Sequence, residues 1–235
     1  MRHRGVGYYV INALNVEYPA PADKEYLLPT TFTPGKLPFL GYNLPAGMTL
    51  ADGCMNVNER DNGTIEPRPD AFFVGNAEAD VVKDQTVTVA MPLLQRSYPI
   101  EFRFVVSSGD PSLLTGISAR LSGIARAFDM ASQTVVTGNP ATIDLNIVKD
   151  DTSAFYIGEA MILGIDGDKQ IIEISFSFAN GKVHQETSDI SRFFGKIGTT
   201  TEKQKIFAIV ESLQEPEFEM SIVDWQLVEG EVEIK

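Results

Sequence analysis

Residues 171–187 read IIEISFSFANGKVHQET. Apolar side chains occupy every second position from Ile172 to Phe178, and mainly polar side chains lie between them. Such alternation places one row of side chains on a core and the other in solvent, as in a half-buried antiparallel strand. Asn180-Gly181 then supplies the two residues that a tight hairpin turn prefers. The stretch therefore predicts two antiparallel strands joined by this turn.

The same alternation recurs along much of the chain. It predicts strands over 86–91, 100–106, 142–147 and 172–178, and weaker patterns predict others over 8–16, 117–124, 155–163, 206–213, 218–225 and 231–234. Helix signals are few: Ser188-Asp189 can cap a turn or two that buries Ile190, Phe193 and Phe194. We therefore expect an all-β, predominantly antiparallel fold.

Proline divides the chain into two parts. Nine of the 13 prolines lie within the first 95 residues, where long irregular stretches separate few clean strand patterns. Proline lacks the N–H group that a strand ladder needs, so such segments form loops or sheet edges. From Ser97 onward the strand patterns follow at closer spacing. A boundary near Leu94-Gln95 predicts one β-sandwich module over 1–94 and a second over 95–235.

The composition excludes several classes of function. With 19 Lys and Arg against 32 Asp and Glu, the net charge is −13. Neutralising phosphates takes a surplus of basic residues, so nucleic acid is excluded as a partner. Two histidines and one cysteine exclude cysteine-rich zinc sites, disulfide frameworks and histidine-rich metal cages. We expect no cofactor and no metal.

Catalytic motifs are weak throughout. A Ser-His-Asp triad would need His3 or His184, and no Gly-x-Ser-x-Gly turn is present. Cys54 lacks a motif partner and is expected to be buried or half-buried. Asp166-Gly167-Asp168 resembles the start of a calcium loop, but a strand pattern begins where further ligands are needed, which favours a hairpin turn. A pair of facing carboxylates, as in glycoside hydrolases, stays open as a hypothesis. We predict that the protein is not an enzyme.

Negative charge gathers near the end of the sequence. Residues 201–235 hold nine acids and three lysines, which is six of the 13 net negative charges. We expect these acids to lie on solvated strand faces, where they discourage edge-to-edge pairing with the wrong chain.

The order of several segments resembles a known family. PDAFFVG at 69–75 precedes the strand pattern over 85–91, and after it come PLLQRSYPIEF at 92–102, LLTGISARLSGIA at 113–125, the Asn180-Gly181 hairpin with SDIS at 188–191, and FEMSIVDW at 218–225. This series resembles the fimbrillin-like surface lipoproteins of Bacteroides-type gut bacteria, which include pilus subunits. The resemblance extends from about Pro69 to the last residues and is loose before it.

The resemblance implies a fold and a location. It implies two tandem antiparallel β-sandwich modules of transthyretin-like or fimbrillin type. It also implies export and display at the cell surface, outer membrane or fimbrium, with membrane contact only through a lipid anchor on the precursor. The sequence departs from the family by lacking a signal segment and by the absence of a long apolar region before Cys54. A first module shortened at its start is one interpretation.

Pilins of this family polymerise by strand exchange, in which an extended segment of one subunit completes a sheet of the next. The resemblance therefore implies a non-catalytic structural or adhesive subunit that assembles with itself or with other fimbrial subunits by β-strand complementation. Candidate donor or acceptor strands lie in the terminal segments and include Val10, Leu14, Val16, Leu227, Val232 and Ile234. Ordinary edge strands within one chain are the alternative.

A second hypothesis is a glycan-binding surface lipoprotein that does not polymerise. Adjacent aromatic residues in a strand point to opposite faces, so one of each pair can be exposed to a host or dietary glycan. The candidate contacts are Phe72, Phe73 and Tyr156. Packing in the core is the alternative for all three.

Overall fold

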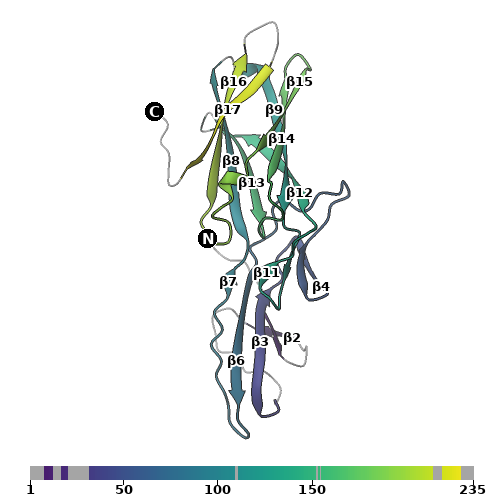
Figure 1. Cartoon of the computed structure of the whole chain (residues 1–235), viewed down its shortest axis with the longest axis vertical. Coiled ribbons are helices and arrows are strands. Elements are labelled where there is room, and N and C mark those ends of the chain that lie inside the picture. The colour runs from purple at the N-terminus through teal and green to yellow at the C-terminus, as the bar shows by residue number, and fades with distance from the viewer. Residues whose placement is uncertain are drawn as a thin grey trace.

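The computed structural model describes residues 8–12, 17–20, 32–108, 111–151, 153, 155–213 and 219–228. Within these residues the regular secondary structure is almost entirely strand, which confirms the predicted all-β class. The described helices are two short 3-10 turns, η1 (Pro111–Leu113) and η2 (Ser191–Phe193). None of the helices in this described part is long and apolar enough to cross a membrane. The molecule is elongated, with its strands running roughly along the long axis (Figure 1).

Three sheets make up the fold. A five-stranded sheet at one end has the order β2-β1-β3-β6-β7, and all its pairs are antiparallel. Its strands are β1 (Tyr8–Asn12), β2 (Glu17–Ala20), β3 (Gly35–Asn43), β6 (Phe73–Val81) and β7 (Leu94–Gln95). The long β3–β6 ladder forms the end of the molecule farthest from β16 and β17 (Figure 1).

A four-stranded antiparallel sheet faces the five-stranded one. It has the order β11-β10-β5-β4, with β4 (Met48–Ala51), β5 (Cys54–Val57), β10 (Ala127–Asp129) and β11 (Thr134–Val135). The rings of Phe72 and Phe128 meet edge to face between the two sheets, with centroids 5.5 Å apart. Strands from both sides of Leu94 therefore build one sheet.

The third sheet has eight strands in the order β15-β14-β9-β12-β13-β8-β16-β17. They are β8 (Tyr98–Ser108), β9 (Leu114–Ile124), β12 (Ala141–Lys149), β13 (Phe155–Ile162), β14 (Ile171–Phe178), β15 (Val183–Asp189), β16 (Gln204–Leu213) and β17 (Glu219–Val228). Strands β12 and β13 share a register of only three residue pairs, and the edge strands β15 and β17 contact each other, so the sheet folds into two facing halves. Strands β8 and β16 are parallel, and the other pairs are antiparallel.

One continuous cluster of buried apolar side chains joins the three sheets. It runs from Tyr42 and Phe72 at one end to Phe176 and Ile206 at the other. The predicted boundary near Leu94 and the prediction of two tandem modules both stay predictions. The shared four-stranded sheet and the shared core tie the regions before and after Leu94 to each other.

A loop of the first region also docks on the eight-stranded sheet. The main-chain N–H of Ile65 donates to the carbonyl of Thr142 at 2.9 Å, and the N–H of Met161 donates to the carbonyl of Pro67 at 2.8 Å. The guanidinium of Arg68 lies 2.8 Å from the carboxylate of Glu159. These contacts fix the orientation of the two ends of the molecule relative to each other.

The strand predictions over 100–106, 117–124, 142–147, 155–163, 172–178 and 206–213 are confirmed. The hairpin at Asn180-Gly181 is confirmed as well, with Gly181 at a φ of 82°. The predicted helical turn is η2, and it buries Ile190, Phe193 and Phe194 as expected. Of the predicted strand over 8–16, residues 8–12 form β1, and residues 13–16 lie outside the described residues, as does the predicted strand over 231–234. Of the predicted strand over 218–225, residues 219–225 lie in β17, and residue 218 lies outside the described residues.

The predicted strand over 86–91 is wrong. Residues 85–93, called the strap below, run back from the end of β6 to β7 as an extended segment outside any ladder (Figure 1). The alternation in the sequence survives as alternating burial: Val89, Met91 and Leu93 are half-buried, and the residues between them are exposed. The strap thus faces the sheet with one row of side chains without pairing with it.

Candidate functional site

Exposed sheet edges are the places where a β protein can add a strand from another chain, because their main-chain N–H and C=O groups lack partners. The eight-stranded sheet has its edges at β15 and β17, and the five-stranded sheet has its edges at β2 and on the outer side of β6 and β7. We consider each edge that carries a predicted site residue or an unpaired segment.

The two edges of the eight-stranded sheet meet and are joined by side chains. The carboxylate of Glu186 on β15 accepts a hydrogen bond of 2.8 Å from the main-chain N–H of Ile222 on β17. Arg192 donates from its guanidinium to the main-chain carbonyl of Trp225, also on β17, at 3.1 Å. Val223 between them is an extra residue in the β16–β17 register, which makes a bulge. Two main-chain groups on the outer edge of β17 therefore already have partners within the chain.

The predicted donor strands occupy different positions. Leu227 lies in β17 opposite Ile206, so its strand is an edge strand of its own chain. Val10 lies in β1 between Tyr18 and Gly41, so its strand is interior. Leu14, Val16, Val232 and Ile234 lie outside the described residues, and strand donation by the terminal segments stays a prediction.

Beyond its first two residues, the outer edge of β6 pairs with none of the described strands. Strand β7 pairs only with Phe73 and Val74. The N–H of Phe72 donates to Ser97 Oγ and its carbonyl accepts from Arg96, on the β7 side, and the N–H of Phe73 donates to Asn43 Oδ1, on the β3 side. Main-chain direction alternates along a strand.

Asn76, Glu78 and Asp80 therefore present their N–H and C=O groups on the side away from β3. No strand in the described part of the chain pairs with them there. The side chains of all three are exposed. This edge, from Gly75 to Val81, is the unpaired segment that the sequence analysis did not identify.

The strap lies beside this edge and partly over the sheet. Gly41 and Gly75 are opposite each other on β3 and β6. A Cβ on Gly41 would meet the side chains of Met91 and Leu93, and a Cβ on Gly75 would overlap the carbonyl of Pro92. The two glycines thus leave the space into which the strap settles, and this close approach holds it out of the plane of the sheet.

The predicted glycan contacts do not share a surface. Phe72 is fully buried against Phe128, and Tyr156 is 5% exposed, with its hydroxyl donating to the carbonyl of Leu114. A ring without an exposed face cannot stack on a sugar, so burial argues against Phe72 and Tyr156 as contacts. Phe73 is half-buried and stays a prediction.

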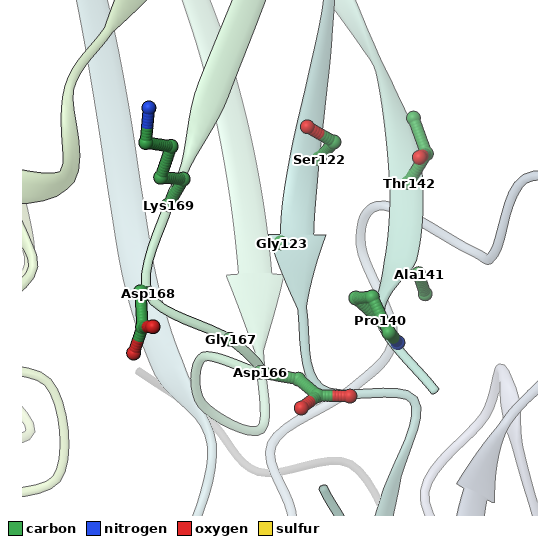
Figure 2. Close-up of a pocket in the computed structure, with 9 residues that line it drawn as sticks. All are labelled: Ser122, Gly123, Pro140, Ala141, Thr142, Asp166, Gly167, Asp168 and Lys169. Atoms are coloured by element: carbon green, nitrogen blue, oxygen red, sulfur yellow. The ribbon is translucent and has the colours of Figure 1, made fainter. Parts of the chain in front are cut away.

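An open hollow of about 500 Å³ lies at the ends of β9, β12 and β14 (Figure 2). Asp166 extends toward its Pro140 side, and Asp168 and Lys169 lie opposite. Both carboxylate oxygens of Asp166 accept main-chain N–H groups, from Gly138 and Asn139, at 2.8 Å each. Asp166 thus orders the loop before β12, in line with the turn interpretation of Asp166-Gly167-Asp168.

The side chains that could act as a catalytic base or nucleophile have structural contacts. His184 on β15 stacks on Phe176 of the neighbouring strand β14, and Cys54 is half-buried. Burial, Asp129 and Asp52 together raise the pKa of the Cys54 thiol, so its reactive thiolate is disfavoured. Among the described residues no three His, Cys, Asp or Glu side chains gather as they would around a metal ion.

One cluster of ionisable side chains joins β8, β13 and the segment before β16. The ammonium group of Lys203 lies 2.6 Å from Glu159 and 3.2 Å from the buried Glu101. The hydrogen bond from Lys203 lowers the pKa of Glu159 against the opposing effect of burial, and the hydrogen bond to Glu159 raises the pKa of Lys203. Arg68 completes the cluster from the docked loop. Its acids are paired with cations, so the cluster ties elements together.

A comparison with protein families now adds to this geometry. Residues 11–230 match the family described as fimbrillin-A associated anchor proteins Mfa1 and Mfa2. The chain belongs to this family. The family resemblance predicted from the sequence is thereby confirmed.

Solved structures of proteins from Bacteroides and Porphyromonas have the same fold. A proposed adhesin from Bacteroides ovatus is 12% identical with a TM-score of 0.64, and the match covers 92% of this chain and 89% of that one. The fimbrial anchor protein Mfa2 from Porphyromonas gingivalis is 10% identical with a TM-score of 0.62, covering 94% and 87%. A proposed polysaccharide-binding protein from Bacteroides thetaiotaomicron is 11% identical with a TM-score of 0.58, covering 89% and 85%. No protein of curated function matches the sequence.

In this member of the Mfa1 and Mfa2 family, two features were not predicted from the sequence: the outer edge of β6 and the side chains that join β15 to β17. The sequence signal for the β6 edge was Pro92 together with Gly41 and Gly75, because these residues mark a segment that approaches a sheet without pairing with it. The contact between β15 and β17 left no local sequence signal, since Glu186 and Ile222 are 36 residues apart.

Proposed function

We propose that this chain is a non-catalytic, fimbria-associated subunit displayed on the bacterial surface, where it joins other fimbrial subunits by β-strand complementation. The observation that carries the proposal is the match of residues 11–230 to the fimbrial anchor family. An elongated all-β molecule with an unpaired sheet edge supports it physically, because main-chain hydrogen bonds and apolar burial are what strand addition requires.

The test is assembly in the native host. A deletion of residues 5–16 would remove β1, an interior strand, and would disturb folding. Val232→Lys with Ile234→Lys is a milder change, because it removes the predicted apolar row of the last segment. We expect fewer or shorter fimbriae at the surface, counted by electron microscopy, with the protein still exported and folded.

A matched control is Glu231→Gln with Glu233→Gln, which makes the same change in net charge in the same segment and keeps its apolar residues. Fimbriae of normal number and length in a strain that lacks the whole gene would refute the proposed function. Normal fimbriae from the Val232 and Ile234 variant alone would refute only the role of this segment as a donor.

A glycan-binding role is the second candidate, and the observation behind it is that one protein of the same fold is described as a proposed polysaccharide-binding protein. Phe73 is the remaining predicted contact. A glycan array with the unaltered chain and with Phe73→Ala tests it: binding that disappears in the variant would favour this role, and no binding of the unaltered chain to any glycan would exclude it for the glycans on the array.

A further inference from the structure

We propose that the open edge of β6, from Gly75 to Val81, is the acceptor for an extended strand of another protein whose outward polar row is basic. This inference rests on the proposed function and names the site and the chemistry of the partner strand. The partner would be antiparallel or parallel to β6 and would continue the five-stranded sheet past β7.

The first step is the main chain. Asn76, Glu78 and Asp80 direct their N–H and C=O groups away from β3, and no described strand receives them. Proline at position 38 agrees with this direction, since it faces Glu78 across the ladder at a pair that exchanges no hydrogen bond with it. An incoming strand would find three donors and three acceptors in register.

The second step is the apolar side. Ala77, Ala79 and Val81 form the row of β6 that is half-buried or buried, on the face where the strap settles at Gly75. Val87 in the strap keeps 38% of its surface exposed, and Val89 and Met91 are only half-buried. A strand added to the edge would place its own apolar row against these incompletely covered side chains and bury them.

The third step is charge. Residues directly opposite each other on neighbouring strands interact, and like charges there are unfavourable. Glu78 and Asp80 belong to the exposed row of the open edge. Lys36 pairs with Glu78 at 3.2 Å, but it lies on β3, on the far side of β6 from the newcomer, in an exposed pair of little energetic weight. Lysine or arginine opposite the two acids is therefore the favourable choice.

The same charges argue against a second copy as the occupant. Residues 227–235 read LVEGEVEIK and carry glutamate at three alternate positions. Paired with β6, that row would lie against Glu78 and Asp80, in a complex of two chains that each carry a net charge of −13. The edge thus disfavours the chain's own last segment and favours a strand of complementary charge.

Labelled peptides test the inference with the full chain in solution. The probes are LVEGEVEIK, the sequence of the chain's own segment, and LVKGKVKIK, in which lysine replaces the three glutamates. We expect the lysine peptide to bind at least ten times more tightly in fluorescence anisotropy. Glu78→Lys with Asp80→Lys should reverse the preference by a similar factor.

Two controls separate strand pairing from general attraction of a cation to an acidic protein. Asp61→Lys with Glu202→Lys makes the same change in net charge at exposed acids outside β6 and should leave the preference unchanged. Two lysine peptides N-methylated at alternate residues should differ, because a strand pairs through one edge only: one should lose binding at least tenfold and the other should keep it.

Equal binding of both peptides, equal effects of the two double variants, or binding that survives both methylation patterns would overturn the inference. Tighter binding of LVEGEVEIK would instead identify a second copy of the chain as the occupant. These outcomes need no fimbria, so they are independent of the gene deletion that tests the proposed function.

Discussion

The carboxylate of Glu186 on β15 accepts a hydrogen bond of 2.8 Å from the main-chain N–H of Ile222 on β17, so one side chain joins the two edge strands of the eight-stranded sheet. A main-chain donor on an edge strand ordinarily has solvent or another chain as its partner. Here a side chain takes that place, so this donor on the β17 edge already has its partner within the chain.

Removal of this acceptor should loosen β17. Glu186→Ala leaves the N–H of Ile222 without its partner, and we expect a loss of about 1–3 kcal/mol in the free energy of unfolding, measured by urea titration. Gln185→Ala is the control, because Gln185 is the exposed neighbour on the same strand. Equal losses in both variants would contradict a specific role for Glu186.

Gly75 should tolerate no side chain. Gly75→Ala would push a methyl group into the carbonyl of Pro92, and we expect a destabilisation of about 1–3 kcal/mol. The displaced strap should also loosen the turn at Lys83, which is already exposed, so that trypsin cuts there faster. Gly116→Ala on β9 is the matched control, because a Cβ there meets no atom within 4 Å. Unchanged cleavage and stability of the Gly75 variant would mean that the strap does not rest on the glycine pair.

The ion cluster at Glu159 predicts a pH dependence. The pKa of Glu159 in the folded chain lies below its unfolded value of about 4.3. Ionised Glu159 therefore stabilises the folded chain above that pH, and this stabilisation is lost as the pH falls through the folded pKa. Glu159→Gln should therefore narrow the difference in unfolding free energy between pH 7 and pH 3. Glu173→Gln, at an exposed acid on β14, is the control. A larger difference in the Glu159 variant would contradict the sign of this shift.

The raised pKa of Lys203 works in the opposite direction. The contribution of Lys203 to the free energy of unfolding is fully present below its unfolded pKa of about 10.4. It is lost only as the pH rises through the higher pKa of the folded chain. The loss of unfolding free energy at low pH should therefore reflect Glu159, and the loss at high pH should reflect Lys203. Lys203→Met removes the partner of Glu159 as well as its own charge, so the unfolding free energy should change less with pH at both extremes.

Phe72 and Phe73 should separate packing from surface contact. Phe72→Ala removes a fully buried ring, and we expect a loss of about 3–5 kcal/mol in urea unfolding. Phe73→Ala, at a half-buried ring, should cost clearly less. Similar losses at both positions would mean that Phe73 is also a core residue and not free to contact a glycan.

The predicted module boundary can be tested by expression of residues 95–235 alone. Strand β10 of this fragment would lose its partner β5, and Phe128 would lose Phe72. We expect a lower melting temperature than that of the full chain and increased binding of a hydrophobic dye. A cooperative transition at the full-chain temperature would support an independent module that begins at Gln95.

The sequence predicted the strands whose alternation matches their burial. Residues 172–178 are an example, because β14 lies between β9 and β15 with one face on the core. Residues 86–91 have the same pattern and form no strand. Alternation reports which side chains face a sheet, whereas the ladder depends on main-chain distance, and the close approach to Gly41 and Gly75 holds the strap out of the plane.

Short or distant pairings escaped prediction for a physical reason. Strands β10 and β11 have three and two residues, too few for a period to be visible. The open edge of β6 depends on where β7 stops, and β7 is a strand of two residues. The burial of Phe72 and Tyr156 could not be predicted, because partners elsewhere in the chain decide which ring of an aromatic pair points inward.

The docked loop between β5 and β6 has a mechanical consequence. The main chain passes between the two ends of the molecule at several places. The hydrogen bonds of Ile65 and Pro67 and the ion pair of Arg68 add noncovalent links between the same two ends. A tensile load along the long axis would therefore be divided among parallel attachments and would not fall on one linker. In a surface fibre exposed to fluid flow, such a subunit would transmit the load as one rigid body and would not bend between its two ends.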